Sequence, residues 1–500
     1  MLRIDGKIYT GLTSPAVTDG LLVGDDGVIV ALGEDARRQA PAHLEQIALG
    51  RRVATPGFID AHAHLEFIAE QLTQLSLDDA SSLDNLLERV AERTRSLPAD
   101  RPVMGVGWDE SDWPEREMPT CQHIDRAAPT HAVCLRRIDG HLWTVNSEML
   151  RRMAARDDLS EDQRRRLEAV SRDGILREGD IALAAPLVEP TAEEKRDGLL
   201  RAMRHAATFG VTCAHDVGKV APTIAALDRD VELPIRVVAA VRPDALDASS
   251  LVEVLEGLRG RRVTPGPVKL FLDGSIGAQT AAVSEPFADD PGNTGQLLWE
   301  EAALEAAVDR FHVAGLQLAL HAIGDRAIRQ ALDVLERVLA RHPRADHRHR
   351  IEHVEIVTPD LIERMAKLGV IASMQPNFVG RWQTPGGLYD ARLGSRRERL
   401  NPLRSMLSAG VPLAFGSDCM PFGALYGIAS AVNHTNPAER LSFVEALHAY
   451  TFASAFAGRI EHLTGSIEVG KQADLIVLSG DPAEHADVKV EEVFVAGRRC

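Results

Sequence analysis

The sequence has 500 residues, 45% of them hydrophobic and 26% charged, and its 56 basic and 73 acidic residues give a formal net charge of −17. The length exceeds one ordinary domain and suits a large globular fold with attached parts. The acidic balance argues against non-specific nucleic-acid binding and against an anionic membrane surface. No apolar run is long enough to cross a bilayer, and the first residues lack the apolar core of a signal peptide, so we expect no membrane association.

The five cysteines are odd in number and contain no C-x-x-C pair. An odd number of cysteines argues against a disulfide framework, and the absence of C-x-x-C pairs argues against a zinc ribbon. The simplest setting is therefore the reducing cytoplasm. Cys213 and Cys419 are expected to be small packing residues, because neither has the surroundings of a nucleophile.

Both ends of the chain contain short apolar or β-branched runs separated by turn signals. Asp25-Asp26-Gly27 separates two such runs near the start and is typical of a hairpin. Similar runs cover 474–478 and 488–495. Because chain termini often lie close together, we expect residues 1–55 and 463–500 to form one small β-sandwich domain.

Residues 65 to about 185 combine helical patterns with polar loops, and no regular alternation of strand and helix is visible there. We expect residues about 70–185 to be an insertion after the first strand of a larger domain, forming part of the substrate pocket.

A regular rhythm begins near residue 190. Thr191 and Glu194 have the spacing of a capping box, which marks the start of a helix. Strands are then expected at 211–216, 268–274, 316–321, 350–353, 370–376 and 411–418, with helices between them. Alternating helix and strand indicate a parallel sheet, and the count and length favour a distorted TIM (β/α)8 barrel over residues 56–462.

Chemical groups gather where these strands end, which is where catalytic groups lie in such barrels. His62 and His64 close the first strand, and residues i and i+2 of a strand point to the same face. His321, His353 and Asp418 close later strands. Nitrogen and oxygen ligands of this kind suit Zn²⁺, and Mn, Fe, Co or Ni are compatible as well.

Each of these residues, taken singly, also has a structural explanation that involves no metal. A single histidine is often a hydrogen-bonded core residue, and Asp418 alone suits a helix cap. Lys269 lies in an apolar strand, and a lysine there can extend its ammonium group to solvent. Their shared position at strand ends favours the metal site.

Lys269 is costly to bury as an ammonium ion, and burial lowers the pKa of its amine. A neutral amine can take up carbon dioxide and become a carbamate. A carbamate bridges two metal ions as a carboxylate does.

Several segments of the sequence resemble a known family. Residues 56–64, 350–353 and 416–418 resemble the amidohydrolase superfamily of metal-dependent hydrolases. More narrowly, the chain resembles the YtcJ-like group (amidohydrolase family 3), which includes N-substituted formamide deformylases, at residues 107–110, 269–275, 321–327 and 374–376.

The resemblance implies a (β/α)8 barrel and a metal centre. It implies that the metal ligands are His62, His64, Lys269, His321, His353 and Asp418. Lys269 would be the carboxylated lysine (N6-carboxylysine) if the centre holds two metals. The implied cofactor is one or two Zn²⁺ ions.

The expected reaction is hydrolysis of a C–N bond, in an amide or N-formyl group of a small molecule, by metal-activated water with Asp418 as general base. Ester, lactone or cyclic-amide hydrolysis, deamination and isomerisation use the same kind of site. A non-catalytic assembly protein that keeps the barrel is a third reading, which the full ligand set opposes.

The expected substrate contacts are Trp108, Arg136, His141, His215 and Gln375, with packing or solvent exposure as the alternative for each. His215 is also a candidate for steadying the oxyanion. Asp325 suits a helix N-cap, and His347 and His349 are expected at the solvated surface. The partner is a small-molecule substrate, with no nucleic acid or membrane, and the chain is a possible homodimer.

Overall fold

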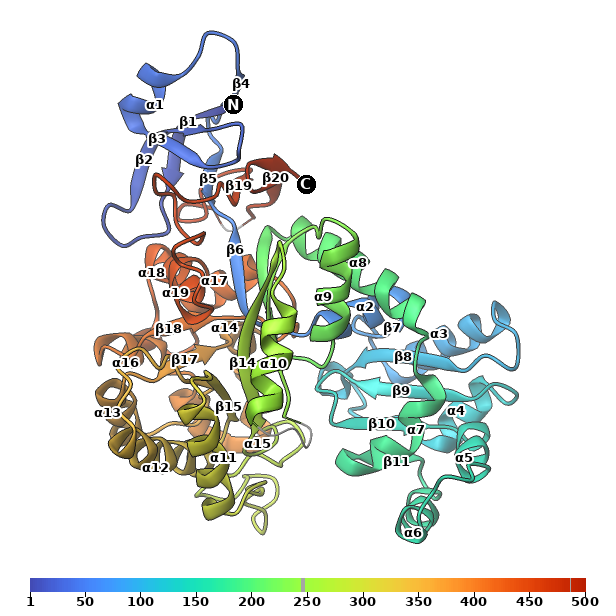
Figure 1. Ribbon diagram of the computed structural model, residues 1–500. Coiled ribbons are helices and arrows are strands. Elements are labelled where there is room, and N and C mark those ends of the chain that lie inside the picture. The colour runs from blue at the N-terminus through green and yellow to red at the C-terminus, as the bar shows by residue number, and fades with distance from the viewer. Residues whose placement is uncertain (244–247, 486) are drawn as a thin grey trace. The chain divides into compact units, whose positions relative to one another are not determined.

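The structure is a computed structural model that describes residues 1–243, 248–485 and 487–500 (Figure 1). The chain forms two compact units. One contains residues 1–65 and 202–500, and the other contains residues 66–201.

In the first unit, both chain ends enter one mixed sheet, in the order β21-β20-β19-β5-β1-β2-β3 with β4 paired to β1. Its strands are β1 (Leu2–Tyr9), β2 (Val17–Val23), β3 (Ile29–Leu32), β4 (Glu45–Ala48), β5 (Val53–Pro56), β19 (Leu475–Leu478), β20 (Val490–Val495) and β21 (Arg498–Arg499). β5 and β19 run antiparallel, with Thr55 opposite Ile476. Ile4, Ile8 and Phe494 belong to the buried core of this sheet. The predicted union of the two termini is confirmed.

The second sheet of this unit contains eight strands in the order β18-β17-β16-β15-β14-β13-β12-β6, and every neighbouring pair is parallel. The strands are β6 (Phe58–Ala63), β12 (Val211–Asp216), β13 (Arg236–Val241), β14 (Val263–Phe271), β15 (Leu318–Ala322), β16 (Arg350–His353), β17 (Ile371–Met374) and β18 (Leu413–Phe415). This sheet with its helices is the predicted TIM-type barrel (Figure 1).

The first and last barrel strands are joined by a few specific contacts. The backbone N–H of Asp418 donates to the carbonyl of His62 at 2.8 Å. Asp60 accepts from the N–H and the hydroxyl of Ser417, at 2.9 and 2.5 Å. A Cβ at Gly416 would lie 2.3 Å from the nitrogen of His62, so the approach requires glycine. These contacts bring the ends of β6 and β18 together.

Helices of this unit follow the strands. They are α1 (Gly33–Gln39), α9 (Ala221–Asp230), α10 (Ala248–Leu258), α11 (Glu301–Val313), α12 (Asp325–Arg341), α13 (Pro359–Leu368), α14 (Pro376–Trp382), α15 (Leu388–Leu393), α16 (Leu403–Ser408), α17 (Ala424–Val432), α18 (Phe443–Ala449) and α19 (Phe452–Ala457). α8 (Ala192–Thr208) spans the boundary of the two units and begins with the predicted capping box of Thr191 and Glu194.

The unit of residues 66–201 has its own sheet, in the order β11-β10-β9-β8-β7. Its strands are β7 (Leu75–Ser76), β8 (Val103–Trp108), β9 (Val133–Arg137), β10 (Leu142–Val145) and β11 (Ile175–Arg177). Its helices are α2 (Leu65–Thr73), α3 (Leu83–Arg95), α4 (Cys121–Ala127), α5 (Ser147–Ala154), α6 (Glu161–Val170) and α7 (Ile181–Val188). Alternate residues of β9 enter two different apolar clusters, so both sheet faces are covered. Sequence analysis expected only helices and loops here and missed this sheet.

No helix in the described part of the chain has the length and apolar character needed to cross a membrane. The prediction that His347 and His349 are surface residues is wrong. Both are buried, and they hydrogen-bond to neighbouring backbone and to His312.

Candidate metal centre

Three potential ligands converge where β6 and β18 end. One ligand atom from each of His62, His64 and Asp418 lies within 4.8 Å of the others. Asp418 Oδ1 is 3.2 Å from His64 Nε2 and 3.7 Å from His62 Nε2. Two imidazole nitrogens and a carboxylate oxygen in this arrangement form a donor set that suits a divalent transition metal.

His353 and His321 extend this group from β16 and β15. The rings of His62 and His353 are 4.7 Å apart between centroids, and those of His353 and His321 are 4.4 Å apart. His321 Nε2 lies 3.1 Å from the carbonyl of Gly274, so this nitrogen already has a protein partner. The four histidines therefore form one cluster, in which His62 and His64 lie nearest to Asp418.

Two hydrogen bonds, one at the Nδ1 atom of His62 and one at that of His353, orient these imidazole rings. His62 Nδ1 lies 2.6 Å from Glu352 Oε2, and His353 Nδ1 lies 2.7 Å from Gln375 Oε1. Both oxygens accept, so each ring carries its proton on Nδ1 and leaves Nε2 free to bind a cation. Gln375, predicted to contact substrate, thus has a contact with a candidate ligand.

Lys269 lies on β14 and is buried, and its Nζ has no hydrogen-bond partner among the described residues. Burial lowers the pKa of Lys269 to about 8, which leaves part of the amine uncharged near neutral pH. A buried amine without a hydrogen-bond partner is unusual, and it fits a group that becomes carboxylated or meets a metal.

The charges of the cluster also suit a cation. Burial lowers the pKa of His62 to about 4, so its ring is neutral and keeps a lone pair. Burial would raise the pKa of Asp418, but the charge that His62 carries when protonated, and the hydrogen bond and charge of His64, outweigh it and hold this pKa below its ordinary range. Neutral imidazoles and an ionised carboxylate are the protonation states that metal binding requires.

Besides Glu352, three carboxylates near the cluster were missed from the sequence. Asp60 joins β6 to the segment after β18, and burial raises its pKa to about 6. Asp273 accepts from three backbone N–H groups, of Ala282, Ile323 and Gly324.

Glu355, the third, is buried two residues after His353, and burial raises its pKa to about 8. Its carboxyl lies beside Tyr389 and Asn401. The sequence offers no signal for their contacts with Ser417, Ile323 and Tyr389, because these partners are distant along the chain.

Three predicted substrate contacts lie in the unit of residues 66–201. Trp108 is fully buried in an apolar cluster of that unit. Arg136 pairs with Glu70 and stacks over the ring of Phe67, at 4.7 Å from its centroid.

His141, the third of these residues, lies 3.2 Å from the carboxylate of Glu178. All three therefore have structural partners within their own unit, and their contact with substrate stays a prediction.

His215 and Asp325 are placed in the first unit. His215 is fully buried on β12, and its Nδ1 lies 3.0 Å from Arg350 Nη1. Asp325 is the first residue of α12, while the N-cap is Gly324, so the predicted cap is wrong by one position. Its carboxylate instead accepts from the backbone and hydroxyl of Ser284.

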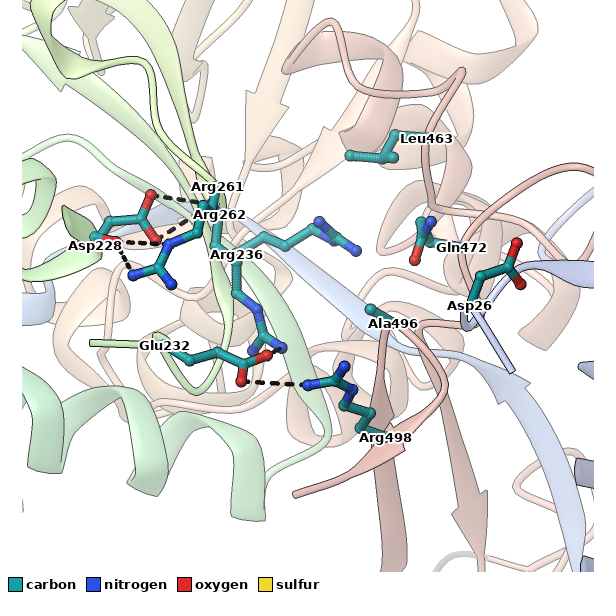
Figure 2. Close-up of a pocket in the computed structure, with 10 residues that line it drawn as sticks. All are labelled: Asp26, Asp228, Glu232, Arg236, Arg261, Arg262, Leu463, Gln472, Ala496 and Arg498. Atoms are coloured by element: carbon teal, nitrogen blue, oxygen red, sulfur yellow. Dashed lines mark hydrogen bonds and ion pairs between the residues drawn. The ribbon is translucent and has the colours of Figure 1, made fainter. Parts of the chain in front are cut away.

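A separate cavity of about 460 Å³ lies at the other end of the barrel strands (Figure 2). Arg236 begins β13, and Arg261 and Arg262 precede β14. Three acidic residues belong to the lining. Asp228 accepts from the backbone N–H of Arg262, and Glu232 pairs with the guanidinium groups of Arg262 and Arg498 (Figure 2). Asp26 accepts from the backbone N–H of Val28. Arg236 pairs with Asp474, outside the lining, and the candidate metal ligands are not among the lining residues.

Comparison with known proteins agrees with this geometry. A model described as the amidohydrolase family matches residues 45–500. The chain is 32% identical to the putative amidohydrolase YtcJ of Bacillus subtilis, over 95% of this chain and 94% of that protein. It is 26% identical to the N-substituted formamide deformylase of Arthrobacter pascens, over 95% of this chain and 92% of that protein.

A crystal structure of an uncharacterized metal-dependent hydrolase from Pyrococcus horikoshii superposes with a TM-score of 0.76. The two are 28% identical, over 97% of this chain and 98% of that one. The family match covers nearly the whole chain and includes every strand of the barrel. The chain therefore belongs to the amidohydrolase family, and it is a hydrolase.

Proposed function

We propose that this hydrolase uses a divalent metal ion to cleave a C–N bond, in an amide or N-formyl group, of a small molecule. The observation that carries the proposal is the convergence of His62, His64 and Asp418 at the C-terminal ends of barrel strands. The similarity to an N-substituted formamide deformylase supports the bond type. The similarity to a structure described as metal-dependent supports the cofactor.

The proposed ligands are His62, His64, Lys269, His321, His353 and Asp418, and the proposed metal is one or two Zn²⁺ ions. A divalent ion supplies Lewis-acid chemistry there, which makes water a nucleophile at neutral pH and polarises the substrate carbonyl.

Asp418 is the proposed proton carrier. Its Oδ1 borders the point on which His62 and His64 converge, and its lowered pKa keeps it ionised and able to accept a proton. It takes a proton from the attacking water and returns it to the leaving nitrogen, so the products are a carboxylic acid and an amine.

Lys269 is the proposed second anionic group. Its uncharged amine adds carbon dioxide, a C–N bond forms, and the amine proton leaves to solvent. The resulting carbamate would bridge two metal ions. The buried Nζ without a hydrogen-bond partner supports this role.

The test combines metal analysis with a substrate panel. Purified protein is assayed for bound metal and then for turnover of matched N-formyl, N-acyl, cyclic amide and ester substrates. We expect stoichiometric divalent metal and turnover of an N-formyl or N-acyl compound that chelators abolish. Hydrolysis of esters alone would overturn the C–N assignment, and absence of stoichiometric metal would overturn the metal assignment.

A substitution tests the role of Asp418. Asp418→Asn should keep metal and lower kcat by about 10²–10⁴-fold, because it removes the proton acceptor and keeps the side-chain shape. The control is Asp360→Asn, on an exposed carboxylate of α13 that pairs with Arg329, and it should keep wild-type turnover. Near-normal kcat in Asp418→Asn would contradict the assignment.

We also propose a reducing compartment, the cytoplasm, for this enzyme. All five cysteines are free, and four of them are buried.

A further inference from the structure

A fully buried ion pair, which has no role in the proposed reaction, lies on the Nδ1 side of the His62 ring. Arg350 and Glu352 are both completely buried on β16, and their side chains lie on one face because they are two residues apart. Arg350 Nε lies 2.6 Å from Glu352 Oε1, and Nη2 lies 2.9 Å from Oε2. This fork-shaped contact fixes both groups in one plane.

Glu352 transmits that geometry to His62. Its Oε2 lies 2.6 Å from His62 Nδ1, so the ring donates to the carboxylate and presents Nε2 on its other side. That Nε2 is the atom 3.7 Å from Asp418 Oδ1. One carboxylate therefore determines both the tautomer and the direction of the ring.

Arg350 also holds the main chain that carries His62. Its Nη2 donates to the carbonyl of Ala61 at 2.5 Å and to the hydroxyl of Ser373, on β17, at 2.9 Å. A single guanidinium thus contacts the backbone before His62 and, through Glu352, the ring of His62. Lysine offers one point charge and lacks the planar fork for these contacts.

His215 completes the surroundings of Arg350. A guanidinium has no acceptor, so Arg350 Nη1 donates to His215 Nδ1 at 3.0 Å, and the proton of His215 resides on Nε2. A Cβ at Gly458 would lie 2.6 Å from that Nε2, so the ring fills the space against the main chain there. The Nδ1 edge of His215 therefore contacts Arg350, and its Nε2 edge lies against Gly458.

We propose that Arg350 is a positioning residue for the metal centre, which holds His62 as the Nδ1–H tautomer through Glu352, with His215 as the neutral acceptor that completes its hydrogen bonds. This inference rests on the proposed function, because it takes His62 as a metal ligand. It also assigns His215 a role that acts through Arg350 rather than on the substrate. Groups that orient a ligating histidine in this way influence metal affinity strongly.

The first test measures metal affinity by chelator competition, in wild type, Glu352→Gln and Arg350→Met. We expect both variants to bind Zn²⁺ about 10–100-fold more weakly than wild type. The matched control is Arg236→Met. Arg236 is also buried and bonds a carboxylate, Asp474, at 2.6 Å, but it lines the separate cavity rather than the metal centre (Figure 2).

The control distinguishes a loss of metal affinity caused by a misplaced His62 from one caused by lower stability of the fold. Arg236→Met should lower the Tm as Arg350→Met does, because each leaves a buried carboxylate without its partner. It should keep wild-type metal affinity. Equal affinity in wild type and in folded Glu352→Gln would overturn the inference, and so would an equal loss in the control.

A conservative pair tests His215. His215→Asn keeps an oxygen acceptor for Arg350 and should keep metal affinity within about threefold of wild type, whereas His215→Leu removes the acceptor and should lower it about tenfold. Equal affinities in the two variants would remove His215 from the inference.

The second test uses the wild-type protein without metal. It therefore tests the tautomer of His62 even if a variant does not fold. Long-range proton–nitrogen correlation spectra of ¹⁵N-histidine protein should show His62 protonated on Nδ1 and His215 on Nε2. The reverse tautomer at His62 would overturn the inference. If wild type binds no metal, the proposed function fails; if it binds metal and the variants equal the control, only the positioning role fails.

Discussion

At the scale of single residues, two ligand-bearing turns have unusual backbone conformations. His353 and Val354 have φ of 74° and 53°, and Asp418 and Cys419 have φ of 50° and 63°. This left-handed region is unfavourable for non-glycine residues, and most of all for a β-branched residue such as Val354. Strained backbone of this kind persists where the surrounding structure imposes it, and it is concentrated at functional sites.

Removing the amine of Lys269 should separate stability from function. We expect Lys269→Met to bind less metal per chain and to lose at least about 10²-fold in kcat. The metal-free variant should have a higher Tm than metal-free wild type, because an apolar side chain replaces a buried amine with no hydrogen-bond partner. Metal analysis and thermal melts of both proteins measure this. Unchanged metal content would exclude Lys269 as a ligand.

Most of the cluster could be predicted from the sequence, because the barrel rule places strand-end residues at one site. The roles of Glu352 and Asp60, and the contact of Gln375 with His353, could not be predicted in the same way. Each is defined by a partner distant in sequence: Glu352 contacts a histidine 290 positions away, and Asp60 contacts a serine 357 positions away. A single sequence contains the residues but not these pairings.

At the scale of elements, the approach of β18 to β6 depends on Gly416. Gly416→Ala should lower the free energy of unfolding by about 1–3 kcal/mol, because its Cβ would lie 2.3 Å from the nitrogen of His62. Gly257, in α10, is the control, since a Cβ there meets nothing within 4 Å. Gly257→Ala should instead stabilise by up to about 1 kcal/mol. Urea unfolding measures both, and equal effects would contradict the prediction.

Hydrogen bonds between the buried His312 and His349 connect α11 to the residue that precedes β16. Leu318 N–H donates to His349 Nδ1, so His349 Nε2–H donates to His312 Nδ1 at 2.8 Å. His312 Nε2 in turn donates to the carbonyl of His342 at 2.7 Å. Burial holds the pKa of His349 well below its ordinary value and lowers that of His312. The network therefore requires neutral rings.

This network makes stability depend on pH. The unfolded histidines bind protons near pH 6.5 and the folded ones only at lower pH, so the free energy of unfolding should fall as pH decreases from 7 to 5. Each histidine contributes at most about 1.4 kcal/mol per pH unit. His349→Gln should show a smaller loss over this interval in urea unfolding. An identical slope in the variant would locate the effect elsewhere.

At the scale of the whole molecule, residues 66–201 have their own sheet with apolar clusters on both faces. Arg201 Nη2 donates to the carbonyl of Leu72 at 3.0 Å, so α8 meets α2 where the chain enters and leaves this unit. A fragment of residues 65–208 should therefore fold alone and melt cooperatively. Near-UV circular dichroism of its tryptophans measures this, and a featureless spectrum would contradict it.

The barrel and the joined termini could be predicted because their patterns extend over many residues. Helix and strand alternate regularly from residue 190, and the terminal runs are rich in β-branched residues. The sheet of residues 66–201 was missed because its strands are short: β7 has two residues, β11 three and β10 four. Periodicity is not visible over so few positions.

The sheet that joins both termini has a consequence for the order of events during synthesis. β5 ends at Pro56, and its partner β19 begins only at Leu475. At roughly 5–20 residues per second, the ribosome needs on the order of 20–80 s to make the intervening chain. Throughout that time one edge of β5 has no strand beside it. An unpaired strand edge promotes aggregation, so a message that translates slowly in its middle should increase aggregation of this protein.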